Sequence, residues 1–465
     1  MNLPALHRRK PSVPRRVQHL SGLFLVLLLP AFLCCACGGK APPSMVLILV
    51  DTLRADRLGL RPGERCAAPE IRKALAEKGT AFLAVQAASP WTTPSVAAVV
   101  TGRYPDEEGI RDLRDPLPPQ ALTLAERLRA AGWHTAAVVS NALAGPAYGL
   151  DQGYASFHLE RYKGPPPGVP GSRAPRPAFT ADKVTDRALD FLQDAEPPFF
   201  LYVHYTDPHE PYLAPPEWRG RFLRGKKVLD EEYLASSAFA EGPPVTPEVL
   251  ESIEACYDAE VAFADREIAR LLARVPGDAV VVLVGDHGEE FMEHGRFLHG
   301  HTLFQELLDV PLVFRGPGIP AGRKVTAPVS HVDIVPTLLE LAGLSPEGSA
   351  LSGRSLVPFF RDPGARPAER LLFSVLETKG FRCTAVRKGR WKLHLTSTKP
   401  SEWLYDLEKD PREQDNLAGK EPEILVNLME AADRRAIGLR APRAALDPEA
   451  ARRREEELRA IGYVK

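Results

Sequence analysis

Two aspartates and a histidine follow runs of apolar residues and could bind a metal ion together. Asp51 follows the apolar run 44–50, while Asp286 and His287 follow the run 279–284 and one glycine. Carboxylate oxygens and an imidazole nitrogen can all bind one divalent ion. A single aspartate at a strand end is as often a helix cap or a turn residue. It is the combination of the three that predicts a metal site.

A segment rich in hydroxyl groups, residues 89–105, could supply an anion site and a nucleophile. Its sequence predicts a turn followed by an apolar helix, with threonines and a serine at the helix start. The N–H groups of a helix N-terminus attract anions. A hydroxyl that also binds a metal is acidified and becomes a nucleophile toward phosphorus or sulfur. Taken alone, hydroxyl side chains before a helix would simply cap it.

Strand and helix patterns alternate along the chain, and the polar residues lie where the strands end. Strands are expected at 44–50, 135–139, 199–204 and 279–284, and helices at 122–131, 183–194 and 247–275. This alternation predicts an α/β fold, a doubly wound, mostly parallel sheet flanked by helices. Ligands bind beyond the carboxyl ends of the strands in such sheets. All four strands end in residues that can bind a metal or a phosphate.

The pattern changes near residue 369 to short strands separated by turns. Strands at 371–375, 383–387 and 391–395 predict a smaller C-terminal antiparallel-sheet subdomain, followed by a helix near 422–435. Residues 164–177 are expected to form an exposed loop rich in proline and glycine, and residues 213–247 a long irregular stretch that could shape substrate access. The expected divisions are a signal at 1–37, a catalytic domain at 44–345, a subdomain at 346–432 and a charged helical tail at 433–465.

The first residues predict export. A basic region at 7–16 precedes an apolar run at 20–33, which is shorter than the roughly 20 residues of a spanning helix. The sequence around Cys37 resembles a bacterial lipoprotein processing site; an uncleaved membrane anchor is the alternative. Either reading predicts a periplasmic or cell-envelope protein held at a membrane. Lys and Arg number 59 against 60 Asp and Glu, so charge gives no indication of a nucleic-acid partner.

Six segments together resemble the sulfatase family of the alkaline phosphatase superfamily. They are VLILVDTLRADRL at 46–58, TTPSVAAVVTG at 92–102, HYTDPHEPY at 204–212, GDHGE at 285–289, ELLDVP at 306–311 and LYDL at 404–407. The resemblance covers roughly residues 44–420, in the order and spacing of the family.

The resemblance implies a role for particular residues. Asp51, Asp286 and His287 match metal-ligand positions, and Thr92 matches the Cys or Ser that sulfatases convert to formylglycine. The ion is then Zn, Mn or Ca, and a histidine ligand favours Zn or Mn over Ca. In the expected mechanism Thr92 is both the nucleophile and a metal ligand.

Three further histidines match positions that contact the substrate. His209 resembles the family histidine at the leaving group or the anion. His299 and His301 both lie near the family's catalytic lysine. His301 matches better by its spacing from Glu306, and His299 ranks slightly higher for its His-Gly setting. Both are kept as candidates.

The chain departs from the family pattern at several of these positions. Thr92 replaces the convertible Cys or Ser, and Val96 replaces an orienting arginine. Thr52 replaces a second aspartate. Asn141 lies in place of a Lys/His pair, where it could donate a hydrogen bond to the anion or serve a turn. A histidine at 287, rather than asparagine, resembles phosphonate and phosphodiester hydrolases of the superfamily.

These features predict a metal-dependent hydrolase of sulfate or phosphate esters that acts outside the cytoplasm through a covalent threonine intermediate. A phospho-group transferase to a lipid or glycan is one alternative, because the same intermediate can be passed to an alcohol. A catalytically inactive, sulfatase-like binding protein is another, because the convertible residue and the arginine are both replaced. The expected partners are the ester substrate and a membrane, with no nucleic acid.

Overall fold

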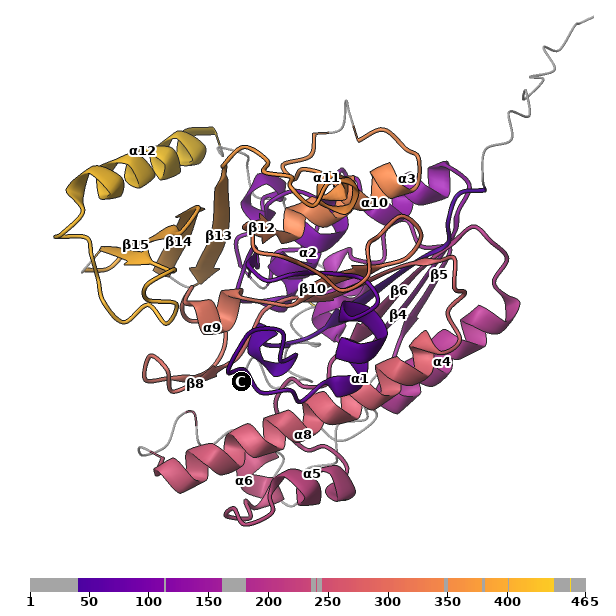
Figure 1. The fold of residues 1–465 in the computed structure, drawn as a ribbon, viewed down its shortest axis with the longest axis horizontal. Helices are drawn as coiled ribbons and strands as arrows, with labels where there is room; N and C mark the ends of the chain where they lie inside the picture. Colours follow the sequence, from indigo (N-terminus) through magenta and orange to yellow (C-terminus); the bar gives the residue numbers. More distant parts are fainter. Residues whose placement is uncertain are drawn as a thin grey trace, which may run out of the picture. The chain divides into compact units, whose positions relative to one another are not determined.

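An eight-stranded sheet lies at the centre of the fold in the computed structural model (Figure 1). In spatial order its strands are β11 (Arg323–Val325), β2 (Thr80–Phe82), β10 (Leu312–Arg315), β7 (Val280–Gly285), β1 (Met45–Val50), β6 (Phe199–Tyr205), β4 (His134–Val139) and β5 (Ser156–Leu159). Only β10 runs antiparallel to its neighbours. The predicted mostly parallel α/β sheet is therefore confirmed, and the four expected strands are β1, β4, β6 and β7.

The structure describes residues 41–112, 114–160, 181–235, 240, 245–346, 350–378, 381–399, 401–438 and 452. The predicted signal at 1–37, the loop at 164–177 and most of the tail at 433–465 lie outside these residues. Among the helices described, none is both long and apolar enough to cross a membrane.

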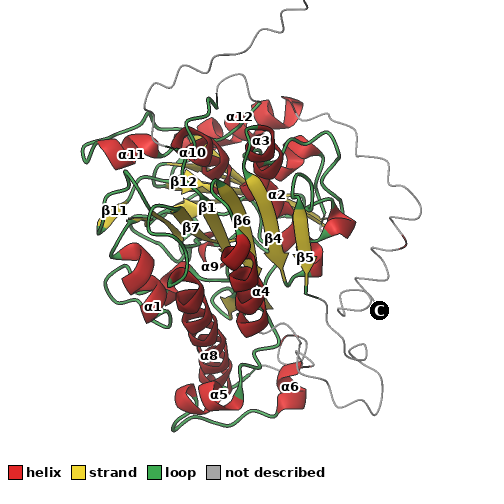
Figure 2. Ribbon diagram, turned by 90° about the vertical axis from the view of Figure 1, so that its right-hand side faces the viewer, coloured by secondary structure: helices red, strands yellow, loops and turns green. Residues whose placement is uncertain are grey.

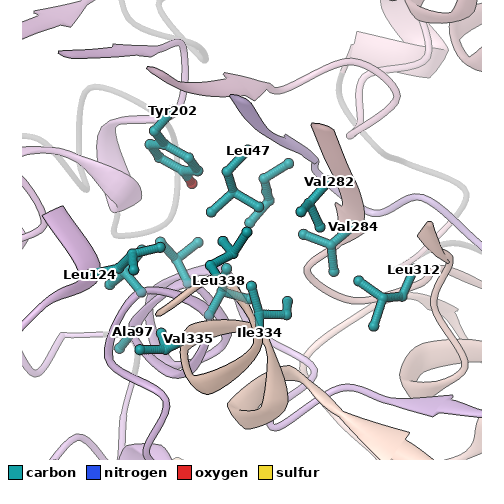
Figure 3. Close-up of a cluster of buried hydrophobic side chains, with 14 of the residues drawn as sticks. Leu47, Ala97, Leu124, Tyr202, Val282, Val284, Leu312, Ile334, Val335 and Leu338 are labelled. Atoms are coloured by element: carbon teal, nitrogen blue, oxygen red, sulfur yellow. The ribbon is translucent and has the colours of Figure 1, made fainter. Parts of the chain in front are cut away.

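Helices cover both faces of the sheet because alternate strand residues point to opposite sides. On one face Leu47 and Leu49 share a buried cluster with residues of α2 (Thr92–Thr101), α3 (Leu124–Ala130) and α10 (Ile334–Leu341). Figure 3 shows this cluster. On the other face Val46 and Ile48 pack with α1 (Pro69–Ile71), α4 (Ala181–Asp194) and α8 (Pro247–Leu272). Figure 2 shows the sheet between these two groups of helices.

Local sequence signals set the helix boundaries. Thr123 Oγ1 accepts a hydrogen bond from Glu126 N at 3.1 Å, and Glu126 Oε2 accepts one from Thr123 N at 2.8 Å. This capping box starts α3. Helix α8 begins with Thr246 as its cap and Pro247 in its first turn. The predicted helices at 122–131, 183–194 and 247–275 therefore match the observed ones to within a few residues.

A second, four-stranded antiparallel sheet follows the main one. It consists of β13 (Leu371–Thr378), β14 (Phe381–Lys388), β15 (Trp391–Thr396) and β16 (Glu402–Asp406), with α12 (Pro422–Gly438) packed on it. The smaller C-terminal antiparallel sheet was expected; its fourth strand was not. Ser374 Oγ donates to Ala87 O at 2.5 Å and Val375 N to Ala88 O at 2.9 Å, so the sheet is bonded to the core. The expected domain boundaries stay predictions.

Short elements fill the remaining connections. They are β3 (Val85–Gln86), β8 (Glu290–Phe291), β9 (Phe297–Leu298), β12 (Val329–Ser330), α9 (Gln305–Leu308), α11 (Val357–Arg361), α5 (Pro216–Phe222) and α6 (Glu231–Ala235). The last two lie within the 213–247 stretch, so the prediction of a wholly irregular loop there is wrong. A proline at N1 starts α5, and this signal was present in the sequence.

Candidate active site

Strand register places Asp51 and Asp286 at the same edge of the sheet. Val50 of β1 pairs with Gly285 of β7, and Asp51 and Asp286 are the residues that directly follow these two. Both carboxylates are fully buried. Because the two strands are parallel and adjacent, their ends bring together two residues that are 235 positions apart in the sequence.

His287 lies against both carboxylates. Its Nε2 is 3.7 Å from Asp51 Oδ1 and 3.5 Å from Asp286 Oδ2. Its Nδ1 donates to Gly288 O at 3.0 Å, which directs the other ring nitrogen toward the acids. Asp286 Oδ1 accepts hydrogen bonds from Thr52 N at 3.0 Å and His287 N at 2.8 Å. The structure thus brings the three expected ligands together.

A fourth group, His204, also belongs to this cluster and was not among the predicted site residues. It lies near the end of β6, with Nε2 3.5 Å from Asp51 Oδ2 and Nδ1 3.0 Å from Tyr202 Oη. Ligand atoms of Asp51, His204 and Asp286 all lie within 4.8 Å of one another. An ionisable residue inside an apolar strand was the signal that could have identified it.

Asn141 is bonded to Asp51 and also serves a turn. Its Nδ2 donates to Asp51 Oδ2 at 2.5 Å, and its Oδ1 accepts from Leu143 N at 2.9 Å. The sequence left open a hydrogen bond to the anion or a turn role. The turn role is observed, and the side-chain amide donates its hydrogen bond to Asp51.

Thr92 begins helix α2 and is fully buried. Its neighbour Thr93 donates from Oγ1 to Leu143 O at 2.8 Å, and Leu143 follows the turn that holds Asn141 against Asp51. The start of α2 is therefore tied to the turn that contacts the acidic pair. Within the described residues Thr92 Oγ1 has no hydrogen-bond partner.

Several buried polar atoms of this cluster lack a hydrogen-bond partner within the described part of the chain. They are Asp51 Oδ1, His204 Nε2, Asp286 Oδ2 and His287 Nε2; Thr92 Oγ1, at the start of α2, also lacks one. A buried polar atom without a partner costs about 1–3 kcal/mol. A set of oxygens and imidazole nitrogens that lack partners is what a divalent cation would satisfy. The residues present therefore fit a metal ion.

Charge in the cluster is unbalanced without a cation. Burial by itself would raise the pKa of Asp51, but the neighbouring His204 imidazole and the charges of His209 and His287 outweigh it and lower that pKa to about 2. Burial and the nearby Asp51 charge raise the pKa of Asp286 well above its ordinary value. Two carboxylates this close repel each other, and a cation between them would relieve the repulsion.

The backbone around the cluster is constrained. Thr52 adopts a left-handed conformation with φ of 53°, and Tyr257 Oη donates to its carbonyl at 2.8 Å. Such strain is concentrated at functional sites. A Cβ on Gly288 would lie 2.0 Å from Glu306 O, so only glycine allows the turn after His287 to pack so closely.

His209 and His299 border the acidic cluster, while His301 turns to another partner. The His299 ring lies 4.4 Å from the His287 ring and 4.9 Å from the His209 ring, measured between centroids. His301 Nε2 is paired with Glu290 Oε2 at 2.7 Å. Burial lowers the pKa of His209, but Glu210 and the other nearby acids outweigh burial and raise it to about 9.

Known families and curated proteins match most of the chain. A sequence profile for the Sulfatase family matches residues 43–344, and one for N-sulphoglucosamine sulphohydrolase, C-terminal, matches residues 292–433. Arylsulfatase K of Danio rerio is 27% identical over 438 residues, covering 83% of this chain and 82% of that protein. Choline-sulfatase of Rhizobium meliloti is 27% identical over 427 residues, covering 81% and 82%.

Solved structures share the fold. One, in complex with its substrate D-glucosamine-2-N,6-O-disulfate, has a TM-score of 0.71 at 19% identity and covers 86% of this chain and 98% of its own. The phosphonate monoester hydrolase of Agrobacterium radiobacter has a TM-score of 0.69 at 22% identity, covering 86% and 95%.

Proposed function

The chain belongs to the sulfatase family and is a hydrolase of sulfate or phosphate esters, and from that premise we propose that it acts on phosphate esters through a covalent intermediate on Thr92. One observation carries the proposal. The Thr92 hydroxyl is buried at the start of α2 without a hydrogen-bond partner in the described residues, and Thr93 bonds this helix start to the turn whose Asn141 contacts Asp51.

The identity of residue 92 favours phosphate over sulfate. Related sulfatases carry a Cys or Ser that becomes formylglycine, and its hydrate releases sulfate by collapsing to an aldehyde. Threonine is not a known substrate for that conversion, and a threonyl sulfate has no such route. A threonyl phosphate, by contrast, can be hydrolysed by water. Thr92 therefore suits phosphoryl transfer better than sulfuryl transfer.

The mechanism follows from where the side chains lie. Thr92 releases its hydroxyl proton to water, and Oγ1 attacks phosphorus in line with the leaving oxygen, whose bond to phosphorus breaks. Water later attacks the same phosphorus, and the Oγ1–P bond breaks to restore the threonine. A divalent ion held by Asp51, Asp286, His287 and Thr92 would lower the pKa of the Thr92 hydroxyl and neutralise charge on the transferred group. The N–H groups at the start of α2 stabilise the equatorial oxygens. His209, with its raised pKa, donates a proton to the leaving oxygen.

Substitution of Thr92 tests the nucleophile. Thr92→Ala should reduce kcat for an aryl phosphate by at least about 1,000-fold, since a missing nucleophile removes the covalent route. Thr92→Ser keeps a hydroxyl and should retain part of the activity. Metal content measured by mass spectrometry should persist in both variants. Full activity of Thr92→Ala would overturn the assignment.

A substrate panel tests the ester class. The purified full chain is assayed on an aryl phosphate, a phosphodiester, a phosphonate ester and an aryl sulfate, with Zn, Mn or Ca added back. We expect a phosphorus ester to be the best substrate, with Zn or Mn the best ion. Faster turnover of the aryl sulfate would overturn the choice of phosphate. Phosphate transferred to an added alcohol, with little released to water, would indicate a transferase.

We also propose that the protein acts outside the cytoplasm, anchored through Cys37. The basic region at 7–16 and the apolar run at 20–33 support export. Cell fractionation with Cys37→Ser should move the protein from the membrane fraction to the soluble periplasmic fraction, if Cys37 carries the lipid. An unchanged membrane fraction would favour an uncleaved anchor instead.

A further inference from the structure

A second group of potential ligands, His209, Glu210 and His299, lies beside the acidic cluster. One ligand atom from each of the three residues lies within 4.8 Å of the others. We propose that this group binds a second divalent cation, of the zinc or manganese type that combines imidazole and carboxylate ligands. The proposal concerns binding alone and does not depend on the Thr92 mechanism.

His299 is oriented as a metal-binding histidine usually is. Its Nδ1 is 2.9 Å from Glu289 Oε1, and Tyr212 Oη donates to Glu289 Oε2 at 3.0 Å. Histidine ligands typically donate one ring N–H to a carboxylate, which fixes the ring and leaves the lone pair of the other nitrogen for the ion. Glu289 and the His299 side chain are buried, so this arrangement is rigid.

His209 shows the same pattern with a backbone acceptor. Its Nδ1 donates to Glu210 O at 2.8 Å, which favours the tautomer with the lone pair on Nε2. The carboxylate of Glu210 lies against the same ring, with Oε2 3.0 Å from Nδ1. Glu210 Oε2 is buried and accepts no hydrogen bond within the described residues, so it retains lone pairs for a cation.

Four carboxyl groups lie in or beside the two groups of ligands. Asp51 and Asp286 belong to the first group, while Glu210 and Glu289 belong to or support the second. One divalent cation balances only two carboxylates, and a second cation would balance all four.

The two groups of ligands are adjacent. The His287 ring contacts the His299 ring at 4.4 Å between centroids, so a cation on His299 would lie close to one held by Asp51 and Asp286. Adjacent cations stabilise the attacking and the leaving oxygens of a displacement together.

Metal stoichiometry tests the proposal without any activity measurement. The full chain is stripped with a chelator, reconstituted with Zn²⁺ or Mn²⁺, desalted and analysed by mass spectrometry, with affinities from calorimetry. Wild type should bind two ions. His299→Ala and Glu210→Gln should each bind one, and so should Asp51→Asn. The double variant Asp51→Asn with His299→Ala should bind none.

His301→Ala is the matched control. His301 is a neighbouring histidine paired with Glu290, and its loss should leave two ions bound. Circular dichroism checks that each variant folds; Glu210→Gln, on a more exposed residue, keeps the test valid if His299→Ala does not. One ion in the wild type, or two ions in both His299→Ala and Glu210→Gln, would overturn the second site. If Asp51→Asn loses only the first ion and still binds one, the second site is supported.

Discussion

Asp51 is the residue on which the first ligand group converges. Its Oδ2 accepts a hydrogen bond from Asn141 and lies 3.5 Å from His204 Nε2, while its Oδ1 lies 3.7 Å from His287 Nε2. The side chain is thus held from one side, and its other oxygen, which accepts no hydrogen bond from the described residues, faces the His287 imidazole. A carboxylate fixed in this way is preorganised for an ion, because its rotamer is set before binding.

Loss of the Asn141 amide should weaken ion binding without removing a ligand. We expect Asn141→Ala to reduce zinc affinity about 10- to 100-fold, since partners that orient a metal ligand have effects of that size. Competition with a fluorescent chelator measures the dissociation constant. Asn416→Ala, which alters a turn beside β16, should leave the affinity unchanged. Equal zinc affinity of Asn141→Ala and wild type would contradict the role given to Asn141.

At the scale of elements, a buried ion pair joins the C-terminal sheet to the segment that follows the histidines. Lys392 Nζ on β15 donates to Leu303 O at 2.7 Å and to Glu413 Oε2 at 3.1 Å, and Glu413 Oε2 accepts from Gln305 N at 2.7 Å. Burial lowers the pKa of Lys392, so the pair offsets only part of the cost of burying the ammonium. The pair nevertheless fixes the start of α9 against the second sheet.

Glu413→Gln should lower the free energy of unfolding by about 3–5 kcal/mol, because it leaves Lys392 buried without its counter-charge. Urea unfolding measures the change. Asp415→Asn is the matched control on the same segment; its pair with Lys420 is more than half exposed and should contribute less than about 1 kcal/mol. A change in Glu413→Gln no larger than that of the control would contradict a stabilising pair.

The same pair predicts a pH dependence. Burial alone would raise the pKa of Glu413, but Lys392 and His394 outweigh burial and lower it from 4.5 to about 2. A depressed carboxyl pKa contributes stability that is present above the unfolded-state pKa and lost as pH falls toward the folded-state value. The difference between wild type and Glu413→Gln should therefore shrink from pH 5 to about pH 2. A difference in stability that stays constant over that pH range would contradict a lowered pKa of Glu413 in the folded state.

At the scale of the whole molecule, the site exists only when distant parts of the chain are assembled. Strands β1, β6 and β7 contribute acids and histidines from positions 51, 204 and 286–287. A cation that binds only this assembled arrangement stabilises the folded state by mass action. The ion and the fold are therefore linked thermodynamically.

Removal of metal should lower the unfolding temperature of the wild-type protein by several degrees. At a free ion concentration about 1,000 times the dissociation constant, binding contributes roughly 4 kcal/mol. Scanning calorimetry with and without a chelator measures the shift. In the double variant Asp51→Asn with Asp286→Asn the repulsion and the ligands are both gone, so the chelator should have a much smaller effect. An identical shift in wild type and double variant would place the stabilising ion elsewhere.

The sequence by itself determined the four main strands and the acidic residues that follow them. Buried parallel strands are continuous apolar runs, so the first polar residue after each run marks the edge where ligands bind. Asp51 follows one such run, and Asp286 and His287 follow another, so the sequence predicts that these three residues lie at that edge.

Only the tertiary structure decided which other side chains join them. His204 lies inside a strand, and only its register against β1 shows that its ring faces Asp51. Asn141 meets Asp51 through a turn, and the loop after His287 sends His299 toward the site and His301 to Glu290. Such choices depend on ångström-scale positions of loops and neighbouring strands, and no local pattern of residues encodes those distances.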